Sequence, residues 1–264
     1  MNLSPPTMSN PRLPQELLDH VVDLLHDKRG ALKSCCLVSK SWIPRTRKHL
    51  FAHLQLSTPE DLRSWRDTFP DPPNSPACYA RNLFIICPQV ATATDVEEGG
   101  WIRAFAHVVH FEIAIRKMDA DELADPRILV PFHGFSPVLE SLRINFTSFP
   151  SSYIFDFINS FPLLEDLSVV SLDRRESYNG FNGSPTAVRT LSRPMLTGSM
   201  ELVLEMGMDC VASRMLSLSG GLHFRELKLT LSRGSDVSLT TALVESCGST
   251  LESLRLNNRI GPSL

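Results

Sequence analysis

The chain has 264 residues, of which 42% are apolar and 21% charged, with a formal net charge of −3. This composition is typical of a globular protein, and no apolar run approaches the ~18 residues of a membrane-spanning helix. The negative balance argues against a dedicated nucleic-acid-binding protein, although it leaves room for a local basic patch.

The cysteine pattern and the first residues of the chain indicate a reducing compartment. None of the six cysteines forms a C-x-x-C motif, and the adjacent Cys35 and Cys36 are poor disulfide partners. The opening residues lack the charged and apolar regions of a signal peptide. We therefore expect reduced thiols and a cytoplasmic or nuclear location.

Apolar residues follow a helical period over the first part of the chain, after a tail (residues 1–11) that we expect to be disordered. Leu17, Val21, Leu24 and Leu25 fall at i, i+4, i+7 and i+8, which predicts one helix. Two more short helices are predicted after Gly30, ending near Leu54. Three helices in about 45 residues form a marginal core, so a partner is expected to cover the surplus apolar surface.

This segment also carries two motifs at a distinctive spacing. It starts with Leu13-Pro14-x-Glu16-Leu17-Leu18 and later contains Val38-Ser39-Lys40-x-Trp42. Residues 12–56 therefore resemble an F-box of the fungal type. The resemblance implies docking onto the Skp-type adaptor of a cullin-RING ubiquitin ligase. By position, eight residues would form that interface: Leu13, Pro14, Leu17, Val21, Leu25, Leu32, Val38 and Trp42.

Three short helices are also compatible with a helix-turn-helix. In that interpretation the basic run from Arg45 to His49 would contact DNA phosphates. A solvated helix face, or an acidic patch on the adaptor or cullin, explains the same run more simply. We therefore regard nucleic acid as an unlikely partner.

Residues 57–79 are predicted to form a short helix and a proline-rich linker. Thr58 has the character of an N-cap, Pro59 suits the first helical position, and Glu60 and Asp61 supply an acidic first turn. The helix is expected to end near Phe69, where closely spaced prolines begin.

Residues 80–264 contain a degenerate repeat with the template apolar-x-x-Leu/Phe-x-Ile/Val/Leu. We call the Leu or Phe position of each copy its anchor. The anchors are Leu83, Phe111, Leu142, Leu167, Leu202, Leu227 and Leu254, and successive anchors are 28, 31, 25, 35, 25 and 27 residues apart. Segments of helical spacing lie between several of them. The pattern predicts an α/β unit with one short strand about every 28 residues.

The repeat resembles a leucine-rich repeat, which implies an irregular solenoid of short parallel strands and helices. It departs from that family because the usual asparagine is absent after the strands. A doubly wound α/β domain is the alternative, although no glycine-rich phosphate loop follows a strand. On the solvated face of such strands we expect a target-binding set: His110, Glu112, Ser141, Arg143, Asp166, Ser168, Glu226, Lys228, Ser253 and Arg255.

The sequence offers no catalytic, metal or cofactor motif. His49 and His53, like His107 and His110, have spacings compatible with zinc but lack further ligands to complete a set. We therefore expect a non-catalytic receptor subunit without cofactor, which joins the adaptor and its cullin-RING ligase to an unknown protein substrate. A protein-interaction scaffold without a link to ubiquitin, or the helix-turn-helix, is the alternative.

Overall fold

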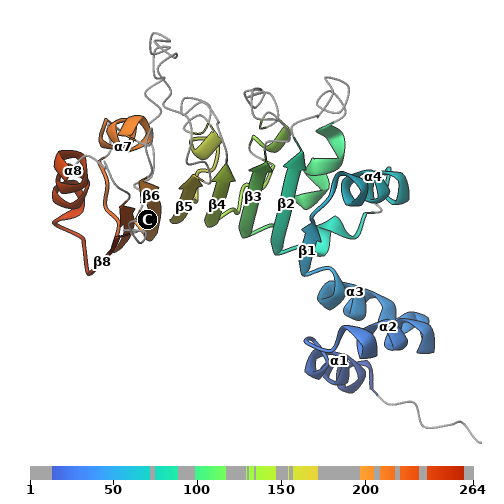
Figure 1. Ribbon diagram of the computed structural model, residues 1–264. Coiled ribbons are helices and arrows are strands. Elements are labelled where there is room, and N and C mark those ends of the chain that lie inside the picture. Colours follow the sequence, from blue (N-terminus) through green and yellow to red (C-terminus); the bar gives the residue numbers. More distant parts are fainter. Residues whose placement is uncertain are drawn as a thin grey trace, which may run out of the picture. The chain divides into compact units, whose positions relative to one another are not determined.

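The computed structural model describes residues 14–71, 75–88, 99–116, 129, 131–133, 135–146, 154, 157–171, 197–204, 209–217, 221–231 and 237–258. The chain divides into two compact units, Met1–His53 and Leu54–Leu264. We call them the helical unit and the sheet unit (Figure 1). The corresponding boundary predicted from the sequence lies at residue 56.

The helical unit contains α1 (Gln15–Leu24), α2 (Arg29–Val38), a 3₁₀ turn (Lys40–Trp42) and α3 (Ile43–Leu50). The third helix ends earlier than predicted because the chain enters strand β1 (His53–Leu56). Among the residues of this unit that the structure describes, the buried side chains are Val22, Leu32, Cys35 and Thr46. The Thr46 hydroxyl donates to the Trp42 carbonyl at 2.8 Å, which satisfies a polar group in this small core.

The sheet unit is built around an eight-stranded sheet whose strands follow one another in chain order (Figure 1). After β1 come β2 (Asn82–Pro88), β3 (His110–Arg116), β4 (Ser141–Phe146), β5 (Asp166–Ser171), β6 (Ser199–Leu204), β7 (Glu226–Leu231) and β8 (Ser253–Asn258). Strands β2 to β8 pair in parallel. The α/β class is therefore correct. The doubly wound alternative is wrong, because that fold requires a reversal of strand order that this sheet lacks.

The sheet unit also contains the helices α4 (Pro59–Thr68), α7 (Asp209–Leu216) and α8 (Val237–Cys247). Two 3₁₀ helices, η3 (Pro76–Tyr79) and η4 (Gly99–Phe105), belong to it as well. Thr58 and Asp61 form a reciprocal capping box at the start of α4, which confirms the predicted helix start. Trp65 of α4 is 9% exposed and its ring lies 5.8 Å from that of Phe105. The helix predicted before the proline-rich stretch therefore contributes to the core of the sheet unit.

The core lies against one face of the sheet, where equivalent residues of successive strands form two columns. One column is Leu83, Phe111, Leu142, Leu167, Met200, Leu227 and Leu254. The other is Ile85, Ile113, Ile144, Val169, Leu202, Leu229 and Leu256. All of them are buried except the two leucines of β8. The alternation of apolar residues along each strand thus produces a continuous core.

One predicted repeat anchor is wrong by two residues. Leu202 pairs with Val169, and Met200 occupies the position equivalent to Leu167 and Leu227. Apolar residues alternate at 200, 202 and 204, so a shift of two positions keeps the same face buried and the sequence pattern does not fix the register.

Successive strands are joined at their starts by a repeated backbone contact. The carbonyls of Val109, Glu140 and Arg225 each accept N–H groups from the first residues of the following strand. Gly198 occupies the equivalent place before β6, where a Cβ atom would lie 2.6 Å from the Glu165 carbonyl oxygen. Only glycine fits this approach without displacing the neighbouring backbone.

Candidate protein-interaction surfaces

The helical unit exposes five large apolar side chains. They are Leu17 at 54%, Val21 at 47%, Leu24 at 66%, Leu37 at 89% and Val38 at 68%. Among the residues that the structure describes, nine large apolar side chains are exposed, and the other four are Leu163, Val237, Leu254 and Leu256. More than half of them therefore belong to the smaller unit.

The exposure of α1 follows from two apolar stripes on one short helix. Val22 is buried and Leu18 and Leu25 are half-buried, and the spacing of these three residues places them on one face. Leu17, Val21 and Leu24 have the same spacing one residue earlier, which turns them by about 100° away from that face. A three-helix unit of this size encloses one stripe and leaves the other in solvent.

The residues of the predicted adaptor interface have different surroundings. Pro14, Leu17, Val21 and Val38 are exposed, Leu25 and Trp42 are half-buried, and Leu13 lies outside the described residues. Leu32 is 0% exposed, so its predicted place in an interface is wrong for this conformation and it belongs to the core.

Two of the most exposed leucines, Leu24 and Leu37, are not in the predicted interface. Leu24 follows Leu17 by seven positions and Val21 by three, so its spacing is sufficient to place it in the outward stripe. No comparable signal exists for Leu37, because apolar residues occur on nearly every side of α2.

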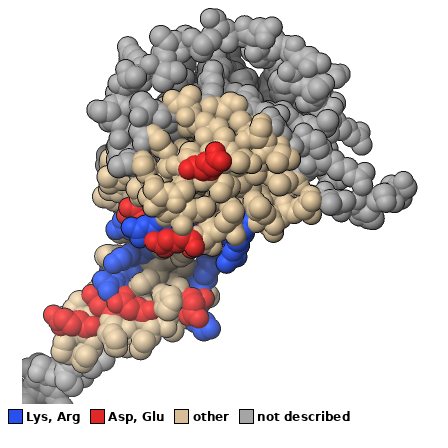
Figure 2. Space-filling view, turned by 90° about the vertical axis from the view of Figure 1, so that its left-hand side faces the viewer, with Lys and Arg blue, Asp and Glu red and all other residues tan. Residues whose placement is uncertain are grey.

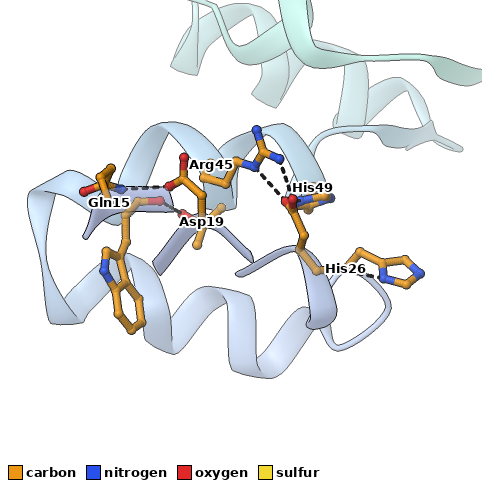
Figure 3. A network of polar contacts seen from close by, with 8 residues as sticks. Gln15, Asp19, His26, Arg45 and His49 are labelled. Carbon is orange, nitrogen blue, oxygen red and sulfur yellow. Dashed lines mark hydrogen bonds and ion pairs between the residues drawn. The ribbon is translucent and has the colours of Figure 1, made fainter. Parts of the chain in front are cut away.

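Polar contacts join α1 to α3 (Figure 3). Asp23 accepts hydrogen bonds from Arg45 Nε at 2.6 Å and from a second guanidinium nitrogen, and its carboxylate lies 2.7 Å from His49 Nε2. The hydrogen bond from Arg45, followed by that from His49, holds the pKa of Asp23 well below its ordinary value. Since Arg45 and His49 are engaged within the unit, the basic run has fewer groups for DNA phosphates than the sequence suggests.

We expect Asp23→Asn to lower the free energy of unfolding by about 1 kcal/mol at pH 7, a small value because the carboxylate is one-third exposed and screened by water. A depressed folded-state pKa stabilises the fold at pH values above the unfolded-state pKa of about 4. This contribution is lost as the pH falls from there toward the folded-state pKa. The difference between variant and wild type, measured by urea denaturation, should therefore shrink below about pH 4.

Asp27→Asn is the matched control, because Asp27 pairs with Lys28 on the surface and is 55% exposed. We expect no measurable change in stability from it. A difference between Asp23→Asn and wild type that stays constant from pH 7 to pH 2 would contradict the assigned role of the carboxylate.

The sheet unit presents a second surface, on the face opposite its core. The ten residues of the predicted target-binding set alternate with the buried columns, and none of them is buried. Six of the set lie in the same two rows across β3 to β5, with His110, Ser141 and Asp166 in one and Glu112, Arg143 and Ser168 in the other. The corrected register of β6 adds Ser199 and Glu201, which the sequence analysis does not include.

Charges on this face are largely compensated across neighbouring strands. Glu112 accepts a hydrogen bond from the Asn145 amide at 2.7 Å and lies 3.9 Å from Arg143. The Ser168 hydroxyl donates to Glu201 at 3.4 Å. A mixed polar surface of this kind suits recognition of another protein better than of a phosphate backbone.

The chain matches no protein-family model, no curated protein and no solved structure. The function is therefore inferred from the two surfaces and from the motifs of the sequence. Within the described ranges, no three histidine, cysteine or acidic side chains are grouped as metal ligands. In the same ranges, no helix has the length and apolar character needed to cross a membrane.

Proposed function

We propose that this chain is the substrate-recognition subunit of an SCF-type ubiquitin ligase. In this proposal the helical unit is an F-box that docks onto the Skp-type adaptor, and the sheet unit is a degenerate leucine-rich-repeat domain that binds a target protein. The chain itself is non-catalytic. It increases the rate of ubiquitin transfer by holding the target near the charged enzyme.

The exposed apolar surface of the helical unit is the observation that carries the proposal. Burial of one leucine or valine side chain contributes roughly 1.5–3 kcal/mol. Burial of four or five of them leaves a net favourable free energy after the costs of association. The surface includes Leu17, Val21 and Val38, three positions that the F-box resemblance assigns to the adaptor.

The sheet unit supports the second half of the proposal. Its strands follow one another in chain order, each offset from the last by 25 to 33 residues in the register. This is the arrangement expected when each repeat contacts only its neighbours. The unburied face of the sheet then offers rows of polar side chains to a bound protein.

The test is the affinity of the purified full-length chain for a Skp-type adaptor, measured by biolayer interferometry. We expect wild type to bind and Leu17→Asp to bind about 10- to 100-fold more weakly, since the variant loses the burial of a leucine and places a carboxylate in an apolar contact. Val237→Asp is the matched control, because Val237 is 74% exposed and lies in the sheet unit. It should bind like wild type.

Absence of binding by the wild type, or equal binding by wild type and Leu17→Asp, contradicts the adaptor proposal. In the first case the alternative of a scaffold without a link to ubiquitin takes its place. A steep loss of affinity with salt is not expected, because the contact surface is apolar.

A further inference from the structure

Helix α1 carries two apolar stripes of the same composition. One consists of Leu17, Val21 and Leu24, and the other consists of Leu18, Val22 and Leu25. Each is a leucine, a valine four residues later and a leucine three residues after that. The second stripe is the first moved along by one residue, so a turn of α1 by about 100° around its own axis would exchange them. Burial of apolar area therefore does not decide which stripe packs inward.

The structure nevertheless shows a single orientation of α1. Val22 is 1% exposed, whereas Val21 is 47% exposed. The helix has ten residues, and its N-cap, Pro14, makes no side-chain capping hydrogen bond. An isolated helix of this length is marginally stable in water. The orientation of α1 must therefore come from its contacts with the rest of the helical unit.

Charged contacts distinguish the two orientations. The helical unit carries Lys, Arg, Asp and Glu side chains on the side seen in Figure 2. Within the described residues of this unit, the ion pairs that join two helices both end on Asp23, one from Arg45 and the other from His49. Arg45 uses both oxygens of the carboxylate, and His49 shares one of them (Figure 3). A two-pronged contact of this kind fixes the direction of Asp23 as well as its distance from α3.

The exchanged orientation would break these contacts. When α1 turns so that the outward stripe packs inward, each side chain takes the direction of the next one along the helix. Asp23 would then point into solvent, in the direction that Leu24 now has. Val22 would take its place, facing Arg45 and His49. The guanidinium and the imidazole would lose their shared acceptor, and an apolar side chain would lie against a cation.

We propose that Asp23 is a positioning residue, which through Arg45 and His49 selects the stripe of α1 that packs inward and thereby presents the other stripe on the surface. The two stripes are interchangeable as apolar contacts, whereas the carboxylate has its partners in one orientation only. A single polar residue sets the register of coiled-coil helices in the same way. The contact between the outward stripe and an adaptor rests on the proposed function, whereas the choice between the stripes does not.

The experiment compares the full-length variants Val21→Cys and Val22→Cys by their rates of alkylation with iodoacetamide, and peptide mass spectrometry identifies the modified position. Because Val21 is exposed and Val22 is buried, Val21→Cys should react at least about tenfold faster. Addition of Asp23→Ala removes the carboxylate, and the two rates should then differ by less than about threefold, since both orientations become populated. Asp27→Ala is the matched control, because Asp27 pairs with Lys28, and it should leave the ratio of rates unchanged.

Two further comparisons keep the test decisive. Arg45→Gln should lower the ratio of rates as Asp23→Ala does, because Asp23 acts through Arg45. Leu17→Cys and Leu18→Cys repeat the measurement one turn earlier on α1, where Leu17 is exposed and Leu18 is half-buried. This second pair replaces the first if Val22→Cys does not fold, as judged by circular dichroism.

A ratio of rates that Asp23→Ala leaves unchanged overturns the proposal. So does a rise of both rates to those of the chain in urea, because the carboxylate would then hold α1 in the fold without choosing between the stripes. Adaptor affinity, measured in parallel, should fall about two- to tenfold in Asp23→Ala, in proportion to the fraction of chains in the exchanged orientation. Failure of the wild type to bind the adaptor refutes the proposed function alone, and an unchanged alkylation ratio refutes the positioning role alone.

Discussion

Replacement of Phe111 by alanine is expected to destabilise the sheet unit by about 3–5 kcal/mol, the range typical of a buried phenylalanine. Phe111 is 2% exposed and comes from the second residue of β3. Its ring centroid lies 4.9 Å from that of Phe135, 5.6 Å from Phe132 and 6.5 Å from Phe157. The variant thus leaves a cavity at the centre of an aromatic cluster and removes three ring contacts.

Urea denaturation of the full-length chain, followed by tryptophan fluorescence, measures this effect through the emission of Trp101 and Trp65. The ring of Trp101 lies 6.4 Å from that of Phe132 in the same cluster, and Trp65 contacts Trp101 through Phe105. Leu163→Ala is the control, because Leu163 is 53% exposed, and we expect it to stay within about 0.5 kcal/mol of wild type. A loss below about 1 kcal/mol for Phe111→Ala would show that this cluster is not the core of the unit.

The columns of the sheet could be predicted from the sequence because two periods act together. Apolar residues at alternate positions define the buried face of each strand, and the near-constant offset between copies predicts that neighbouring strands align. The same period of two explains why the predicted repeat anchor in β6 is wrong. Met200 and Leu202 both lie on the buried face, and only the backbone pairing with β5 decides between them.

The exposed apolar residues of the helical unit are harder to predict than its helices. Helical spacing shows which residues share a face, but α1 carries two apolar stripes, and the sequence does not state which of them packs inward. The structure places Val22 inside and Leu17 outside. Leu32 illustrates the same limit, since a leucine that the F-box resemblance assigns to the adaptor interface is enclosed by the unit's own helices.

The double variant Leu24→Asp/Leu37→Asp is expected to lose adaptor binding almost completely, by roughly 100- to 10,000-fold. It should cost no more than about 2 kcal/mol of stability, a cost that arises because each aspartate stands in the last turn of its helix. Each leucine contributes about 1.5–3 kcal/mol when it is buried by a partner, and the two contributions add if the sites are independent. Because Leu24 and Leu37 are 66% and 89% exposed in the free chain, the new carboxylates remain in water until the partner docks. Interferometry against the adaptor measures the affinity, and thermal unfolding followed by circular dichroism measures the stability.

Two further variants separate an interface effect from a folding effect. Leu24→Met/Leu37→Met keeps the apolar surface and should bind within about threefold of wild type, since leucine and methionine have similar volume and hydrophobicity. Leu32→Asp buries a carboxylate in the core and should unfold the helical unit, so it loses binding together with its helical signal. If the double aspartate variant were to bind like wild type while remaining folded, the exposed apolar surface formed by α1 and α2 would not be the docking surface. The surplus of apolar side chains on this small unit would then need a different partner.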